Sequence, residues 1–217
     1  MRPFLSVPII AAAAVLAGLP IARGAEGLRT FVIDEAASTL TIRIFRAGLF
    51  SVFAHDHLLV AHGIAGRVRY DDRDVSQSSL QLSVPVGSLI VDDAEHRERE
   101  GMEGEFSEED IQEVREILLS EAFLDEGNHP RIVATAVDIT GEPPLLNLGL
   151  NVRIKQTEKV IRVPIRVTMD EETFRAEGEL FLLQSDFGIE PFSSFLGFIS
   201  VKDTIQIRFD ILGRTLE

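Results

Sequence analysis

The sequence predicts an all-β chain that folds into an eight-stranded antiparallel barrel with one short helix. Three observations lead to this class. Apolar and polar residues alternate with a period of two over most of the chain after residue 30, which is typical of strands that bury one face. The alternating segments are long and separated by short turns, and closing such a sheet into a barrel removes its exposed edges. One segment has a helical period instead.

The alternation is clearest in the segment 145–156. There Leu146, Leu148 and Leu150 alternate with residues that include Asn147 and Asn151. Turns are expected where turn-forming residues gather, at 71–72, 141–144, 157–158 and 170–171. The eight predicted strands, in chain order, are 39–45, 60–70, 79–86, 131–140, 145–156, 161–169, 173–183 and 201–211.

The helical segment begins at Ser107. A hydroxyl residue followed by acids, one of them three positions after the cap, is a typical helix start. Ile111 and Val114 then follow the helical period, so we expect a helix over 107–119 that packs one face on the barrel. The preceding stretch, 92–105, is highly charged and contains two glycines, and we expect it to be a mobile solvated loop.

The first residues predict export. A positive start is followed by an apolar block over 4–19 and by the small-residue pattern Ala22-Arg23-Gly24, which is the order found in a secretory signal peptide. The block of roughly 16 residues is shorter than the ~20 that a membrane-spanning helix needs, and an uncleaved anchor is the alternative. We therefore expect a signal peptide over 1–24, cleavage near Gly24, one barrel domain over 25–217, and a periplasmic or secreted protein.

The composition limits the partners and the chemistry. The formal net charge of −14 becomes −16 when Arg2 and Arg23 are removed with the signal peptide, so charge does not favour nucleic acid or an anionic membrane surface. The absence of cysteine excludes a disulfide framework, a thiolate metal site and the lipid-modified cysteine of a lipoprotein. Fourteen phenylalanines against one tyrosine and no tryptophan suit an apolar interior.

Few motifs indicate reactive chemistry. The sequence has no Gly-x-Ser-x-Gly elbow and no glycine-rich phosphate loop, and its 35 acidic residues single out no catalytic pair. We therefore expect a protein that is not an enzyme. The conspicuous cluster is His55-Asp56-His57, because two histidines at this spacing on a strand point to one side and can ligate one metal ion. The glutamate that usually follows such a pair in metal-binding barrels is missing, and the competing interpretation is a loop in which Asp56 and the imidazoles bond to the backbone and to one another.

The segment 186–198 is unusually apolar for a loop. It carries Phe187, Phe192, Phe195 and Phe198 among glycine, proline and serine residues. Four phenylalanines are too apolar to leave free in water. We expect either a lid over the barrel mouth, which makes at most transient contact with a membrane during loading, or a plug that folds back into the core.

Several motifs in this strand order carry a family resemblance. The most specific is Ser185-Asp186-Phe187-Gly188-Ile189 before the last strand, and others lie at 31–34, 38–40, 63–71, 120–125 and 129–132. Over nearly all of the mature chain, the sequence resembles the YceI-like family of exported polyisoprenoid-binding proteins, which are extended lipocalin-like barrels. It departs from the family at 155–159, where many members have a Gly-x-Thr-like stretch, and His55-Asp56-His57 belongs to a subset of members.

The resemblance implies a carrier or store that holds an isoprenoid lipid or a quinone and has no activity of its own. An eight-stranded barrel is wide enough inside to hold one slender ligand. Residues expected to face this ligand from the interior and the mouth are Leu40, Ile42, Ile44, Val68, Leu82, Val84, Phe123, Leu148, Leu150, Val152, Leu180, Leu182, Phe187, Phe192, Phe195, Phe198, Ile205, Ile207 and Phe209. Each of them individually also fits ordinary core packing.

Two other interpretations stay open at this point. One is a metal-dependent enzyme or metal carrier that holds a divalent ion with His55 and His57. The other is a stress-related interaction protein with a solidly packed barrel, for which the acidic loop 92–106 is the partner surface. A homodimer is compatible with the sequence, and the ligand head group is not identified by it.

Overall fold

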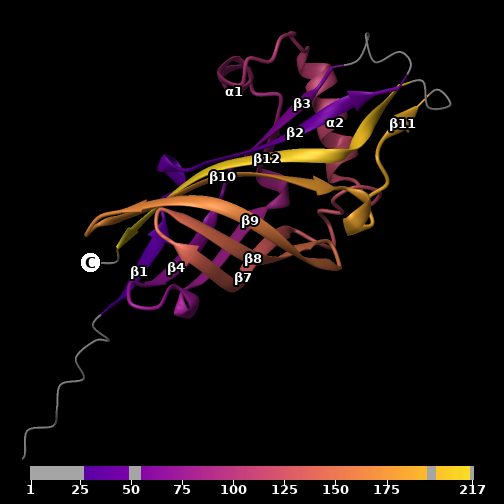
Figure 1. Cartoon of the computed structure of the whole chain (residues 1–217). Helices are drawn as coiled ribbons and strands as arrows, with labels where there is room; N and C mark the ends of the chain where they lie inside the picture. The colour runs from indigo at the N-terminus through magenta and orange to yellow at the C-terminus, as the bar shows by residue number, and fades with distance from the viewer. Residues whose placement is uncertain (1–26, 49–54, 195–198, 216–217) are drawn as a thin grey trace, which may run out of the picture.

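A computed structural model of the chain describes residues 27–48, 55–194 and 199–215, so the predicted signal peptide over 1–24 lies outside the described residues. The predicted fold class is confirmed, because antiparallel strands form one continuous sheet that closes into a barrel (Figure 1). The strands are β1 (Leu28–Ile33), β2 (Thr39–Ala47), β3 (His57–Ala61), β4 (Ala65–Asp71), β5 (Ser79–Pro85), β6 (Leu89–Val91), β7 (Arg131–Glu142), β8 (Leu145–Ile154), β9 (Thr157–Met169), β10 (Thr173–Leu183), β11 (Ser193–Ser194) and β12 (Ile199–Thr215).

Eight of these strands form a closed ring in the order β1-β4-β5-β7-β8-β9-β10-β12, and β12 pairs with β1 to complete it. β12 is 17 residues long and pairs with β10 along one edge. Its other edge pairs first with β2 and then, near its end, with β1, where Gly213 lies opposite Ile33. β2 continues through β3 to β6, which extends the sheet beyond the ring.

The structure corrects several predicted boundaries. The segment 60–70 is not one strand but two, β3 and β4, which are separated by a turn at Gly63, where φ is 68°. The short strands β1, β6 and β11 were not predicted. The turn expected at 157–158 lies two residues earlier, at Lys155 with its φ of 54°, because the strand alternation of β9 already begins at Thr157.

The helix expected over 107–119 is confirmed as α2 (Glu108–Leu119). Ser107 accepts a hydrogen bond from the Asp110 amide, and the Asp110 carboxylate accepts one from the Ser107 amide, which completes a capping box. Arg115 donates to the backbone carbonyls of Gly87 and Leu89 and so holds α2 against β6.

The expectation of a solvated loop over 92–105 is wrong for its first half, while 100–105 are irregular and mostly exposed. The segment contains a second short helix, α1 (Ala94–Arg99), in which Arg97 is only 4% exposed. The charge pattern misleads here because the guanidinium of Arg97 is buried against a carboxylate and backbone carbonyls, which a local pattern does not reveal.

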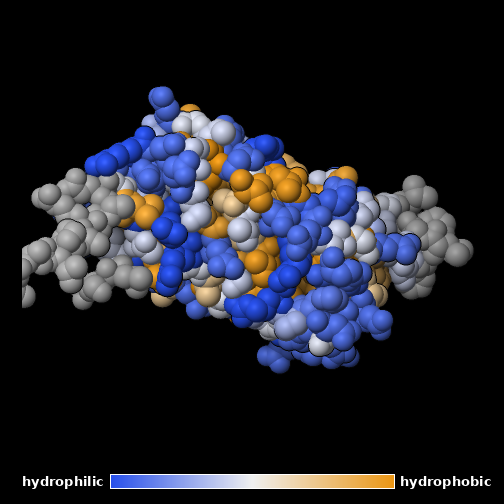
Figure 2. Space-filling model, turned by 90° about the horizontal axis from the view of Figure 1, so that it is seen from below, coloured by the Kyte–Doolittle hydropathy of each residue, from blue (hydrophilic) through white to orange (hydrophobic). Residues whose placement is uncertain are grey.

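The outer surface is largely hydrophilic, with hydrophobic patches on the face seen in Figure 2. Among the described helices, none combines the length and the apolar character that a membrane crossing requires. Six large apolar side chains of the described residues are exposed, namely Ile90, Val137, Leu145, Val160, Phe181 and Leu183.

Close approach between β4 and β5 depends on Gly66. A Cβ atom at this position would lie 2.5 Å from the Gln81 carbonyl oxygen and 3.2 Å from a side-chain carbon of Ile33. We expect Gly66→Ala to lower the free energy of unfolding by roughly 1–3 kcal/mol, because the strand backbone itself must shift. Gly127→Ala is the control, since no atom lies within 4 Å of its added Cβ. Urea unfolding followed by circular dichroism measures both, and equal losses would contradict the prediction.

Candidate ligand-binding cavity

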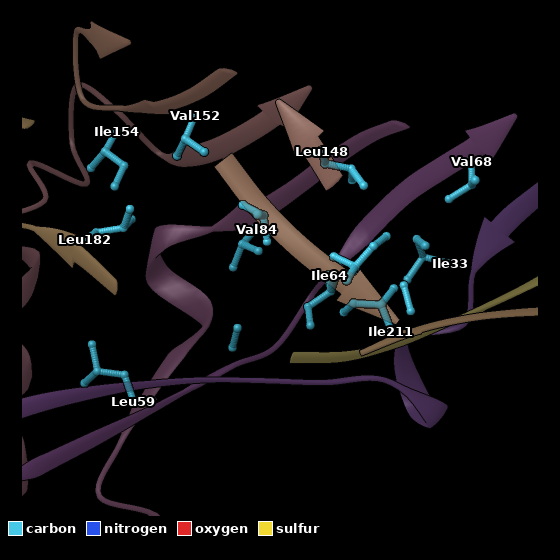
Figure 3. Packing of buried hydrophobic residues seen from close by; sticks show 14 of the residues in the cluster. Ile33, Leu59, Ile64, Val68, Val84, Leu148, Val152, Ile154, Leu182 and Ile211 are labelled. Atoms are coloured by element: carbon cyan, nitrogen blue, oxygen red, sulfur yellow. The ribbon is translucent and has the colours of Figure 1, made fainter. Parts of the chain in front are cut away.

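Inward-facing side chains of the barrel enclose a cavity of about 230 Å³. Strand pleating sends every second residue to this side, for example Leu148, Leu150 and Val152 of β8. Figure 3 shows side chains from facing walls, such as Leu59 and Val152, pointing into the same interior space. The volume exceeds the ~150 Å³ of an apolar cavity that stays dry and binds benzene. The interior is therefore hollow, which disagrees with the interpretation of a solidly packed barrel.

The structure places nearly all of the predicted ligand-facing residues on the wall of this cavity. The exceptions are Phe192, which is not among the lining residues, and Phe195 and Phe198, which lie outside the described residues. Whether the lining side chains contact a ligand stays a prediction. Lining residues that the period of two did not reveal come from β3, β6 and the chain around α2, and include Leu59, Leu89, Leu118 and Leu124.

The cavity wall is almost entirely apolar, and none of the described residues that line it is charged. The polar members are Tyr70, Ser78, Ser79 and Gln184. The Gln184 side-chain amide donates to the Lys202 carbonyl oxygen at 2.9 Å, and the Ser78 hydroxyl accepts from the Asp71 amide at 2.9 Å. Burial raises the pKa of Tyr70, so this side chain stays neutral at physiological pH. The wall therefore suits an apolar chain and offers no charge to a head group.

Arg29 lies beside the end of the cavity that Tyr70 and Phe174 line. The alternation of β1 turns this residue to the same side as Phe31, and its guanidinium lies 5.7 Å from the ring centres of both Phe31 and Tyr70. It also donates to the Asp170 carbonyl oxygen at 2.8 Å, in the turn between β9 and β10. The Phe31 and Phe174 rings pack behind it with centroids 5.6 Å apart.

The opposite end is covered by the chain around α2. Leu118, Phe123 and Leu124 line the cavity there. The Lys155 ammonium donates to the Glu121 carbonyl oxygen at 2.9 Å and so links the turn between β8 and β9 to this cover.

The motif with the most specific family resemblance forms part of the wall. The amide and hydroxyl of Ser185 donate to the Asp203 carboxylate at 2.8 and 2.5 Å, and these hydrogen bonds hold the pKa of Asp203 below its usual value. A 3₁₀ turn, η5 (Ser185–Phe187), follows and ends at Gly188 in the left-handed region, with φ at 71°. Phe187 and Ile189 are thereby buried against the cavity. Of the two alternatives for the apolar loop, the one in which it folds back into the core describes Phe187.

His57 takes part in a buried ion-pair network. Its Nδ1 lies 2.6 Å from Asp92 Oδ2, while Asp92 Oδ1 accepts from the Leu58 amide at 2.9 Å and from Arg97 at 2.6 Å. Burial alone raises the pKa of Asp92, but the contacts with His57, Leu58 and Arg97 outweigh it and lower that pKa. Arg97 also lies over the Phe106 ring at 4.6 Å. The network holds α1 against β3.

The other members of the histidine cluster also have structural contacts. Asp56 accepts from the Arg43 guanidinium at 2.7 Å and from the Arg46 amide at 3.0 Å, and His55 packs edge-on against Phe106. Over the described ranges, no group of three or more His, Cys, Asp or Glu side chains is placed to hold a metal ion. A metal site at His55 and His57 stays a prediction.

The buried network leads us to expect a large loss of stability when Asp92 is replaced. Asp92→Ala leaves the buried Arg97 charge without its carboxylate, and removing one partner of a buried pair costs about 3–5 kcal/mol. Arg99→Ala, on the same helix, breaks the exposed pair with Glu95 and should cost less than about 1 kcal/mol. Urea unfolding followed by circular dichroism compares the two. A similar loss in both variants would show that the buried network does not stabilise the fold.

The comparisons with known proteins agree with this architecture. The family model described as the YceI-like domain matches residues 31–212. The crystal structure of Burkholderia cenocepacia BcnA aligns with a TM-score of 0.62 at 17% identity, covering 83% of this chain and 98% of that one. The Campylobacter jejuni YCEI protein aligns with a TM-score of 0.54 at 11% identity, covering 73% and 85%.

At these identities the two solved structures support the fold alone, and no curated protein matches the chain. The family model, in contrast, spans most of the sequence. A closed antiparallel barrel with a hollow apolar interior and a matching family model leads to one conclusion: the chain belongs to the YceI-like family.

Proposed function

We propose that this protein is an exported, non-catalytic binding protein that holds a long-chain isoprenoid or a similar lipid in its barrel. The observation that carries the proposal is the closed ring of strands around an apolar cavity, whose lining includes no charged side chain among the described residues. Membership of the YceI-like family supports it. The proposal of export is based on the predicted signal peptide over residues 1–24, and an exported protein would be periplasmic or secreted.

The shape of the cavity favours a slender chain over a compact ring system. Its lining on β10 runs from Phe174 to Leu183, which is about 30 Å at ~3.3 Å per residue. A cavity of about 230 Å³ that extends over such a length has a narrow cross-section. Each buried CH₂ group contributes about 0.8 kcal/mol, so a prenyl or acyl chain has ample driving force even after the loss of chain entropy.

The proposal can be tested on protein purified from its own host, where the natural ligand is present. Native mass spectrometry of the mature protein, purified without detergent, should show an adduct, and organic extraction should release a prenyl alcohol, a prenyl quinone or another long-chain lipid. Repeated recovery of bare protein with no extractable lipid would contradict the proposal. Recovery of stoichiometric metal instead would favour the histidine cluster.

Filling the cavity should weaken binding without affecting the outer surface. Ala134 of β7 lines the cavity, while its neighbour Thr135 is exposed. We expect Ala134→Phe to weaken the binding of cis-parinaric acid at least tenfold, or about 1.4 kcal/mol, because the new ring occupies the space of the chain. Thr135→Phe is the matched control and should bind like the parent. Fluorescence titration measures both, and equal affinities in the two variants would place the bound chain elsewhere.

A further inference from the structure

The barrel wall has a seam where two neighbouring strands separate. β9 and β10 pair only where Ile165–Met169 lies opposite Phe174–Gly178. Beyond this point, the described residues 157–164 of β9 and 179–183 of β10 have no pairing with each other, although β9 stays paired with β8 and β10 with β12. Figure 1 shows the two strands running together on the left of the view and separating towards the right.

The sequence explains why the pairing stops there. Pro164 has no amide hydrogen, and the ladder with β10 ends beside it while the ladder with β8 continues past it. Opposite, Gly178 has no side chain, and the Phe209 ring takes that space, since a Cβ at Gly178 would lie 2.5 Å from the ring. Both features favour an opening at this position.

The two edges of the seam carry apolar side chains on the outside of the barrel. Val160 on β9 is 59% exposed, and Phe181 and Leu183 on β10 are 56% and 42% exposed. These are three of the six exposed large apolar residues of the described chain. Leu183 also lines the cavity, as does Ile161 next to Val160. The interior space therefore comes close to the outer surface at the seam.

The seam is closed by side-chain contacts rather than by a strand ladder. η5 packs against β9, with Phe187 turned into the cavity. Lys159 Nζ lies 3.6 Å from Asp186 Oδ1, which joins β9 to η5 by an exposed ion pair. Such pairs contribute at most about 1 kcal/mol and break readily. The Ser185–Asp203 hydrogen bonds meanwhile keep the base of η5 attached to β12.

We propose that this seam is the portal through which the apolar chain of the ligand enters and leaves the cavity, with η5 as a flap that swings about its anchor at Asp203. The inference rests on the proposed lipid-binding function. Among the described residues, buried aromatic side chains beside Arg29 fill one end of the barrel, and the chain around α2 lines the cavity at the other. The seam can open without loss of a strand pairing, because 157–164 of β9 and 179–183 of β10 are not paired with each other.

Tethering the flap tests the portal. The chain has no cysteine, so the pair Lys159→Cys and Asp186→Cys can be joined selectively by a short bismaleimide. We expect the uptake rate of cis-parinaric acid, followed by stopped-flow fluorescence, to fall at least tenfold in the tethered protein, and its release to slow in parallel. Mass spectrometry verifies that the tether is complete.

The matched control joins Asp138→Cys and Arg162→Cys, in place of an exposed ion pair between β7 and β9, where Gly149 of β8 is paired with both positions. Its uptake rate should equal that of the untethered protein. Unchanged uptake with a complete flap tether, or equal slowing by both tethers, would overturn the portal. If the untethered parent takes up no probe at all, the proposed function itself fails and the portal fails with it.

A second variant opens the flap instead of locking it. Asp186→Ala removes the ion pair with Lys159 and should speed uptake about twofold to fivefold, the effect expected for loss of an exposed ion pair. Arg162→Ala, which removes the control ion pair, should leave the rate unchanged. Slower or unchanged uptake in Asp186→Ala would count against the flap.

Discussion

The backbone hydrogen bonds around the barrel are the constraint on which the remaining structure depends. Each strand fixes the register of the next, and a slip of one residue would turn every inward side chain to the solvent. β12 fixes the register of more strands than its neighbours do, because it pairs with β10 on one edge and with both β2 and β1 on the other. The apolar cavity is a consequence of the register, since the inward half of each strand is aliphatic or aromatic nearly throughout.

Polar interactions are confined to the ends and the outside of this barrel. Arg29 lies at one end and donates to the turn between β9 and β10, and the Asp92–Arg97 pair holds α1 against β3. Ser185 and Asp203 fix the turn after β10. None of these charged side chains is among the described residues that line the cavity, so an apolar chain inside it lies against an uncharged wall. The wall is weakest where side chains alone close it, and local opening is expected at such places.

The sequence was sufficient to predict the barrel, α2 and most of the cavity lining, because a period of two identifies the buried face of a strand without knowledge of its partners. The same reasoning missed β1, since Arg29 occupies an inward position and interrupts the apolar alternation. It misjudged the first half of 92–105, because the burial of Arg97 depends on the fold of its own segment around Asp92 and on the Asp56 carbonyl oxygen of another segment. The separation of β9 from β10 could not be predicted either, since Pro164 and Gly178 show their effect only when the pairing is known.

The position of β12 at the end of the barrel sequence has a consequence for how the chain folds. The ring closes between residues 31–33 and 213–215, which are about as far apart in sequence as any paired residues here. A chain emerging from the ribosome therefore cannot complete the barrel until its final strand is free, and such long-range pairing makes folding slow. Until then, the edges of β1, β2 and β10 stay open to wrong partners. A chaperone that shields these edges would therefore act on this molecule until β12 has paired with β1.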